Sequence, residues 1–113
     1  MAKYSLDEKS DKIIINLQIE KDSTFHDIAK PTIVAVKEAI AKTKKRRILR
    51  IEFNSNSTIL FSKNIDIKEY LYAFIPKYIL PYVSVVHFGL HTLRNDKPKN
   101  VIPKEYDTLF DPN

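Results

Sequence analysis

Three features that are scarce in this chain limit what it can do. It has no cysteine, which excludes thiol catalysis, cysteine-based metal sites and disulfide frameworks. Its one glycine, Gly89, is too few for a Walker loop or a dinucleotide fingerprint, because phosphate-cradling loops need several glycines. The longest apolar run, near 83–86, is far too short to span a membrane, and residues 1–12 are too polar for a signal peptide. We expect a soluble, cytoplasmic protein without membrane attachment.

The remaining composition suits one folded domain. The chain has 113 residues, of which 43% are hydrophobic, so a single core is feasible without a metal or a disulfide. Lysine and arginine total 19 against 14 acidic residues, a formal net charge of +5. This excess raises the question of an anionic partner without answering it.

Two stretches alternate apolar and polar residues, as half-buried strands do. One runs over residues 12–20, and the other, which we take as the centre of the fold, over residues 47–53. The expected core-facing residues are Ile13, Ile15, Leu17, Ile19, Leu49, Ile51 and Phe53. The expected opposite faces carry Ile14, Asn16, Gln18 and Glu20 in the first strand and Arg50 and Glu52 in the second.

Apolar residues at helical spacing predict a helix between these strands. It should begin near Asp27, a candidate N-cap, and hold Pro31 in its first turn. It should fade near Lys44, because the cations that follow suit the negative end of the helix dipole.

A second helix is expected after residue 65. Asp66 and Glu69 have the spacing of a capping box, Pro76 should kink the helix, and Pro81 should end it. Tyr72 lies off the apolar stripe of this helix and is a candidate for protein contact.

Four other segments complete the organisation. Residues 1–11 are charged and form either a mobile arm or a weak edge, and we assign them as an arm before a single domain over 12–90. Residues 58–62 form either a short strand or an extended loop, and 82–88 form a strand closed by Gly89. Residues 91–113 form a proline-containing tail that should pack in part.

These elements predict an α/β fold of two layers, with a small mixed sheet and helices on one face. The order is β-α-β-(β)-α-β, and the mostly polar second face of the strands argues against helices on both sides. If residues 58–62 form a strand, the ferredoxin-like split βαβ is the alternative topology.

A dense basic cluster marks the end of the first helix and the start of the central strand. Such composition is typical of surfaces that bind nucleic acid or other anions, although a solvated helix end explains it as well. The cluster consists of Lys42, Lys44, Lys45, Arg46, Arg47 and Arg50.

No catalytic, cofactor or metal site emerges from the spacing of other reactive residues. A hydrolase that used His87, His91 or Asp96 would need these groups to converge, and nothing in their spacing fixes that. Glu52 beside Arg50 is best explained as a surface ion pair. We therefore expect no cofactor, and an enzyme is the less favoured interpretation.

The run from Ile13 to Phe88 resembles the small STAS-like domains related to the bacterial SpoIIAA anti-sigma antagonists. The match is one of order: a strand, a helix with a basic end, a strand at 48–53, a second helix with an internal proline, and a valine-rich strand. The resemblance implies regulation through protein–protein contacts. The antagonists carry a phosphorylatable serine before the second helix, and Ser62 is the nearest position here, without the accompanying glycine.

The sequence therefore favours a non-enzymatic interaction or regulatory domain. Its partner is another protein or a second copy of the chain, with Asn16, Gln18, Glu52 and Tyr72 as the candidate interface. The alternative is a small nucleic-acid-binding module that uses the basic cluster.

Overall fold

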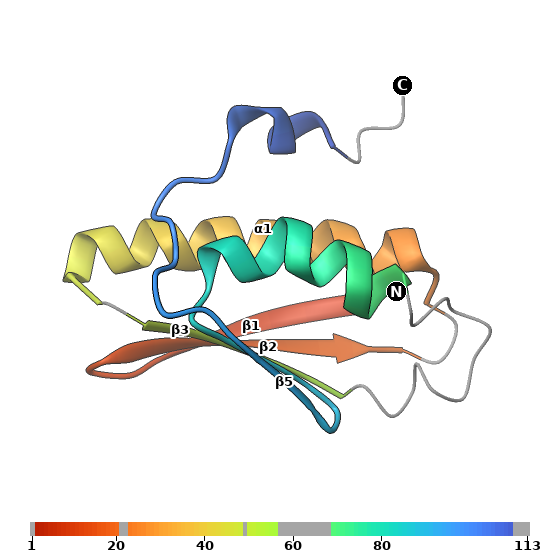
Figure 1. Cartoon of the computed structure of the whole chain (residues 1–113), viewed down its shortest axis with the longest axis horizontal. Coiled ribbons are helices and arrows are strands. Elements are labelled where there is room, and N and C mark those ends of the chain that lie inside the picture. The colour runs from red at the N-terminus through yellow and green to blue at the C-terminus, as the bar shows by residue number, and fades with distance from the viewer. Residues whose placement is uncertain (1, 21–22, 49, 57–68, 110–113) are drawn as a thin grey trace.

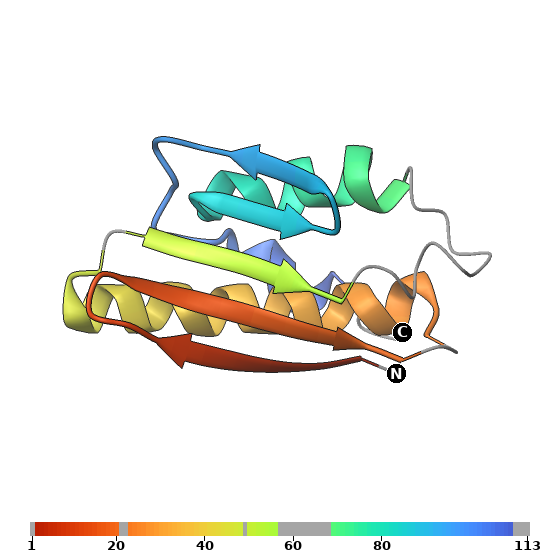
Figure 2. The same ribbon diagram turned by 90° about the horizontal axis from the view of Figure 1, so that it is seen from below.

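Five strands form one mixed sheet in the computed structural model of the protein, and the helices lie on one face of it (Figure 1). The structure describes residues 2–20, 23–48, 50–56 and 69–109. The strands are β1 (Ala2–Glu8), β2 (Lys12–Ile19), β3 (Arg50–Ser55), β4 (Val85–Phe88) and β5 (His91–Arg94), in that order across the sheet. The three inner strands are parallel, and each outer strand is antiparallel to its neighbour (Figure 2). The predicted two-layer α/β fold is confirmed.

Helix α1 (Phe25–Arg46) connects β2 to β3 and begins earlier than the sequence indicated. Thr24 is its N-cap: the Thr24 hydroxyl accepts from the Asp27 N–H at 3.2 Å, and the Asp27 carboxylate accepts from the Thr24 N–H at 3.1 Å. Asp27 is thus the third residue of a capping box and not the cap itself. As a result, Pro31 lies in the second turn of the helix and not in the first.

The predicted central strand is present as β3, between β2 and β4. Ile51 and Phe53 are buried on the helix side, as the alternation predicted, whereas Leu49 lies outside the described residues. Arg47, expected at the start of the strand, instead caps α1 in the left-handed conformation with φ 54°. Glu52 is buried too, so the solvated position expected for it is wrong.

The second helical segment consists of the π-helix η1 (Tyr70–Ile79) and the 3₁₀ turn η2 (Leu80–Tyr82). The Leu80 N–H donates to the Ile75 carbonyl, five residues back, which is the spacing of a π-helix. Pro76 lies inside η1, and Pro81 lies within η2 and does not end the helical backbone. Asp66, with the capping box expected there, Ser62 and the segment 58–62 lie outside the described residues.

Both edges of the sheet extend beyond the expected domain of residues 12–90. Residues 2–8 form β1 and not a mobile arm, and residues 91–94, assigned to the tail, form β5. A two-residue loop, Gly89–Leu90, joins β4 to β5, and Gly89 takes the positive φ of 64° that such hairpin turns require. Since β2 pairs directly with β3, the βαβ unit is not split, and the ferredoxin-like alternative does not describe this sheet.

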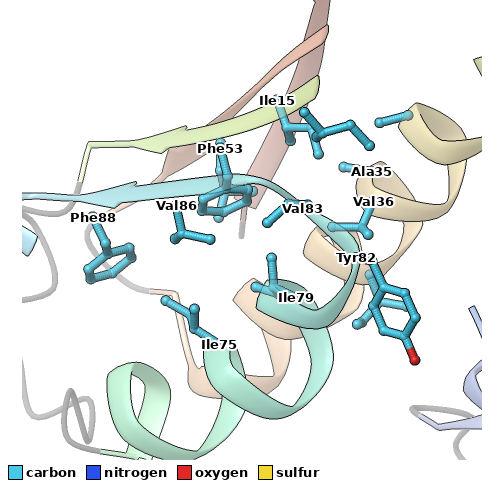
Figure 3. Close-up of a cluster of buried hydrophobic side chains, with 14 of the residues drawn as sticks. Ile15, Ala35, Val36, Phe53, Ile75, Ile79, Tyr82, Val83, Val86 and Phe88 are labelled. Atoms are coloured by element: carbon cyan, nitrogen blue, oxygen red, sulfur yellow. The ribbon is translucent and has the colours of Figure 1, made fainter. Parts of the chain in front are cut away.

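The core lies between the sheet and the helices. Figure 3 shows side chains from both layers meeting there, among them Ile15, Ala35, Val36, Phe53, Ile75, Ile79, Val86 and Phe88. After β5 the chain crosses the outer side of the helices and forms the 3₁₀ turn η3 (Lys104–Thr108) (Figure 1). There the Tyr106 ring lies 5.2 Å from that of Tyr78 and 6.0 Å from that of Tyr82, centroid to centroid.

Candidate functional site

The sheet face opposite the helices, named the open face below, has no helix over it among the described residues (Figure 2). Side chains alternate along each strand, and residues paired across the register share a face. The open face therefore comprises Lys3, Ser5, Asp7, Lys12, Ile14, Asn16, Gln18, Arg50, Glu52, Asn54, Val85, His87, Thr92 and Arg94. The structure thus places Asn16, Gln18, Arg50 and Glu52 on one surface.

A charged network occupies the centre of the open face. Lys12 Nζ lies 3.3 Å from Glu52 Oε2, and Arg50 Nη2 lies 3.0 Å from Glu52 Oε1. The Glu52 side chain is 11% exposed, against 29% for Lys12 and 45% for Arg50. A carboxylate with so little access to water loses much of its hydration, and the two cations offset that loss. The pair expected between Arg50 and Glu52 is therefore part of a fixed three-residue network.

A shallow hollow of about 300 Å³ adjoins this network. It is lined by Arg50, Ser84, Val85, Arg94, Asn95 and Asp96. Asn95 holds one wall in place, because its N–H donates to the Ser84 carbonyl at 2.9 Å and its Nδ2 donates to the Leu80 carbonyl at 2.7 Å. Arg94 is exposed and forms no ion pair with any residue in the described part of the chain. The hollow therefore offers guanidinium donors to an external acceptor.

The structure divides the basic cluster into separate groups. Glu8 of β1 binds two members on the side of α1 above that strand: Glu8 Oε1 lies 2.8 Å from Lys42 Nζ, and Oε2 lies 2.7 Å from Arg46 Nη1. These contacts hold the pKa of Glu8 below its ordinary value, with the larger effect from Lys42 and the smaller from Arg46. Arg50 belongs to the network of the open face. Half of the cluster is therefore already engaged in ion pairs within the chain.

The other half lies at the C-terminal end of α1. Lys44, Lys45 and Arg47 are exposed and form no ion pair with a described residue. Lys44 and Arg47 line a cavity of about 590 Å³ with Thr43, Ile48, Asp96, Pro98 and Asn100. These three cations are the part of the cluster that remains available to an anion.

The remaining candidate residues do not meet in one place. Tyr72 is 71% exposed but lies on η1, on the helix side, so it cannot share a surface with the open face. His87 lies on the open face, where Nδ1 is 3.3 Å from Thr92 Oγ1, whereas His91 pairs with Phe88 and so lies on the helix side. Within the described residues, no three acidic or histidine side chains gather closely enough to hold a metal ion.

Sequence reasoning missed the contribution of β1. The Tyr4 hydroxyl donates to Glu38 of α1 at 2.7 Å, and this hydrogen bond raises the pKa of Tyr4. The signal was present, because Tyr4 and Leu6 alternate with Lys3, Ser5 and Asp7 as in a strand, but the many charges obscured it.

Two further findings bear on the function. Within the described ranges, no helix combines the length and the apolar character needed to cross a membrane. Comparison of the chain with protein-family models, with curated proteins and with solved structures gives no match.

Proposed function

We propose that the protein is a non-enzymatic interaction domain of STAS-like type that binds another protein through its open face. The observation that carries this proposal is the Lys12–Glu52–Arg50 network, which fixes charged groups on a sheet face that none of the described helices covers. Groups fixed before binding lose less conformational entropy when a partner arrives. The order of parallel strands and connecting helices supports the STAS-like type, because the resemblance rests on that order.

The charges of the open face indicate the chemistry of the partner. Four cations and two carboxylates lie on this face, so its net charge is positive. They are Lys3, Lys12, Arg50, Arg94, Asp7 and Glu52. A partner that presents carboxylates to Arg50 and Arg94 complements this face, and arginine is a frequent anchor of protein interfaces.

Site-specific photo-crosslinking tests this proposal. A photoreactive residue at Gln18, which is exposed on the open face, is compared with one at Tyr72, which is exposed on the helix side. We expect adducts with a different protein at Gln18, and we expect Arg94→Glu to remove them. Adducts at Tyr72 with none at Gln18 would place the interface on η1 and contradict the proposal.

A second function is favoured by Lys44, Lys45 and Arg47, the cations without a partner in the described part of the chain. We propose as the alternative that these residues bind the phosphates of a nucleic acid. Each contact between a cation and a phosphate of duplex DNA releases about 0.9 counterions. Three such contacts predict a slope of about −2.7 when the logarithm of the association constant is plotted against the logarithm of the salt concentration. Titration of duplex DNA at two salt concentrations measures that slope.

The same titration separates the two functions. Lys44→Glu with Lys45→Glu should abolish nucleic-acid binding but leave the Gln18 adducts unchanged, because these residues lie in the last turn of α1, on the helix side of the sheet. A protein interface of mixed charge should respond only weakly to salt. DNA binding that is insensitive to salt would eliminate the alternative.

A further inference from the structure

The outer edge of β1 pairs with none of the described strands, and the sequence of β1 allows it to pair symmetrically with a copy of itself. β1 has β2 on one side and no strand on the other among the described residues, and Figure 2 shows it at the margin of the sheet. The Lys9 N–H donates to the Lys12 carbonyl across the hairpin at 2.8 Å, so odd-numbered residues of β1 direct their backbone groups toward β2. The backbone groups of Tyr4 and Leu6 consequently point outward, available to another strand.

The length of β1 defines one symmetric way to pair it with a copy of itself. An antiparallel pair that uses all seven residues is centred on Ser5, so residue n faces residue 10 − n of the copy. Outward-pointing residues then meet one another: Tyr4 forms a hydrogen-bonded pair with the partner's Leu6. Lys3 faces the partner's Asp7 in a non-hydrogen-bonded pair, where side chains approach most closely.

The side chains match in this register. Lys3 and Asp7 are both exposed on the open face and carry opposite charges, and the twofold axis forms their pair twice. Tyr4 and Leu6, both half-buried against the core, form an aromatic–aliphatic pair on the helix side.

Other registers lose this match. A shift by two residues puts Tyr4 opposite either the partner's Tyr4 or the partner's Glu8, and no longer pairs Lys3 with an acid. A shift by one residue sets outward-pointing residues opposite residues whose backbone groups already bind β2, so the hydrogen bonds between the two copies cannot form.

We propose that a second copy of this chain pairs with it along β1, centred on Ser5. The two five-stranded sheets then become one continuous sheet, and the two open faces become one larger surface. This closed, twofold arrangement covers an edge that would otherwise invite uncontrolled pairing. The pairing does not depend on the function proposed for the open face.

The opposite edge of the sheet offers no such match. β5 has only four residues. A symmetric pair centred on Leu93 sets Arg94 opposite the partner's Thr92, so this pair has no opposite charges. A symmetric pair centred on Thr92 sets His91 opposite the partner's Leu93. The self-complementary pattern therefore distinguishes β1 from β5.

An engineered disulfide on the twofold axis tests the register. The chain has no cysteine, so Ser5→Cys introduces a single thiol, and non-hydrogen-bonded pairs have Cα atoms about 4.5 Å apart, within the range that disulfides bridge. Matched controls are Ser10→Cys in the β1–β2 hairpin and Thr92→Cys on β5, both exposed positions. Under mild oxidation we expect rapid, nearly complete cross-linking of Ser5→Cys and slow, partial cross-linking of the controls.

A charge reversal provides the second test and does not rely on cysteine chemistry. Lys3→Asp or Asp7→Lys alone places like charges opposite each other twice, which should weaken the dimer by about tenfold or more. The double variant restores opposite charges and should recover the wild-type dissociation constant, measured by analytical ultracentrifugation. Circular dichroism checks that each variant is folded.

Three results would overturn the proposal. The first is a wild-type chain that stays monomeric at millimolar concentration. The second is cross-linking of Ser5→Cys that is no faster than that of Ser10→Cys. The third is a double charge reversal whose dimer dissociates as readily as those of the single reversals. None of them affects the Gln18 adducts with a different protein, so the failure of this proposal and the failure of the proposed function are distinguishable.

Discussion

Replacing Phe53 by alanine should remove a large part of the stability of the protein. Phe53 is fully buried on the central strand, beside Ile15 on β2 and Val86 on β4, and faces the helices (Figure 3). Substitutions of buried phenylalanine by alanine cost about 3–5 kcal/mol, because apolar contact is lost and the cavity closes only in part. Domains of this size are stable by about 5–15 kcal/mol, so the variant should approach the limit of folding.

Urea unfolding followed by circular dichroism measures this cost. Asn54→Ala is the matched control, because Asn54 is the next residue of β3 and lies half-exposed on the open face. We expect the control to change the free energy of unfolding by less than about 0.5 kcal/mol, with the same m-value for both variants. A cost below about 1 kcal/mol for Phe53→Ala, or an equal cost for both variants, would show that the strand faces the other way.

Three further substitutions give independent checks. Thr24→Ala should cost about 1 kcal/mol in urea unfolding, because it removes half of the capping box. Asn56→Ala should cost about 1–3 kcal/mol by the same assay, because the Asn56 side chain accepts from the Ile19 N–H at 2.7 Å and donates to the Ile19 carbonyl at 3.1 Å. Glu8→Gln should lower stability at neutral pH. Lys42 lowers the pKa of Glu8 in the folded protein, so wild type should be more stable than Glu8→Gln above the ordinary pKa of 4.5. This difference in the free energy of unfolding should disappear as the pH falls through the lowered pKa of Glu8, as urea unfolding at several pH values would show.

The parts of the fold that the sequence predicted are those with a local signal. Period-two alternation identifies β2 and β3, helical spacing identifies α1, and β-branched residues identify β4. The start of α1 was misplaced because Asp27 is itself a good capping residue. The signal for the true start was the three-residue spacing from Thr24 to Asp27, which is that of a capping box with Thr24 as the cap. The π-helical hydrogen bonding of η1 was not predicted, because the apolar spacing that indicates a helix does not tell hydrogen bonds to the fourth residue back from hydrogen bonds to the fifth.

The candidate site was predictable only where it depends on alternation along a strand. Alternation places Arg50 and Glu52 on the same face, and the structure shows them there. The division of the basic cluster was not predictable, because Arg46 meets a carboxylate that lies 38 residues away on β1. The ion pair between Glu52 and Lys12 was likewise not predictable, because only the pairing of β2 with β3 brings the two residues close.

The central claim is that the helices cover one face of the sheet and leave the other available to partners. Methyl relaxation by a soluble paramagnetic agent tests it directly on three consecutive residues of β2. Ile14 lies on the open face and is partly exposed, whereas Ile13 and Ile15 are fully buried beneath the helices. We predict strong relaxation of the Ile14 methyl groups and almost none for Ile13 and Ile15. Equal protection of all three would mean that both faces are covered, and relaxation of Ile13 or Ile15 above that of Ile14 would mean that the sheet is inverted.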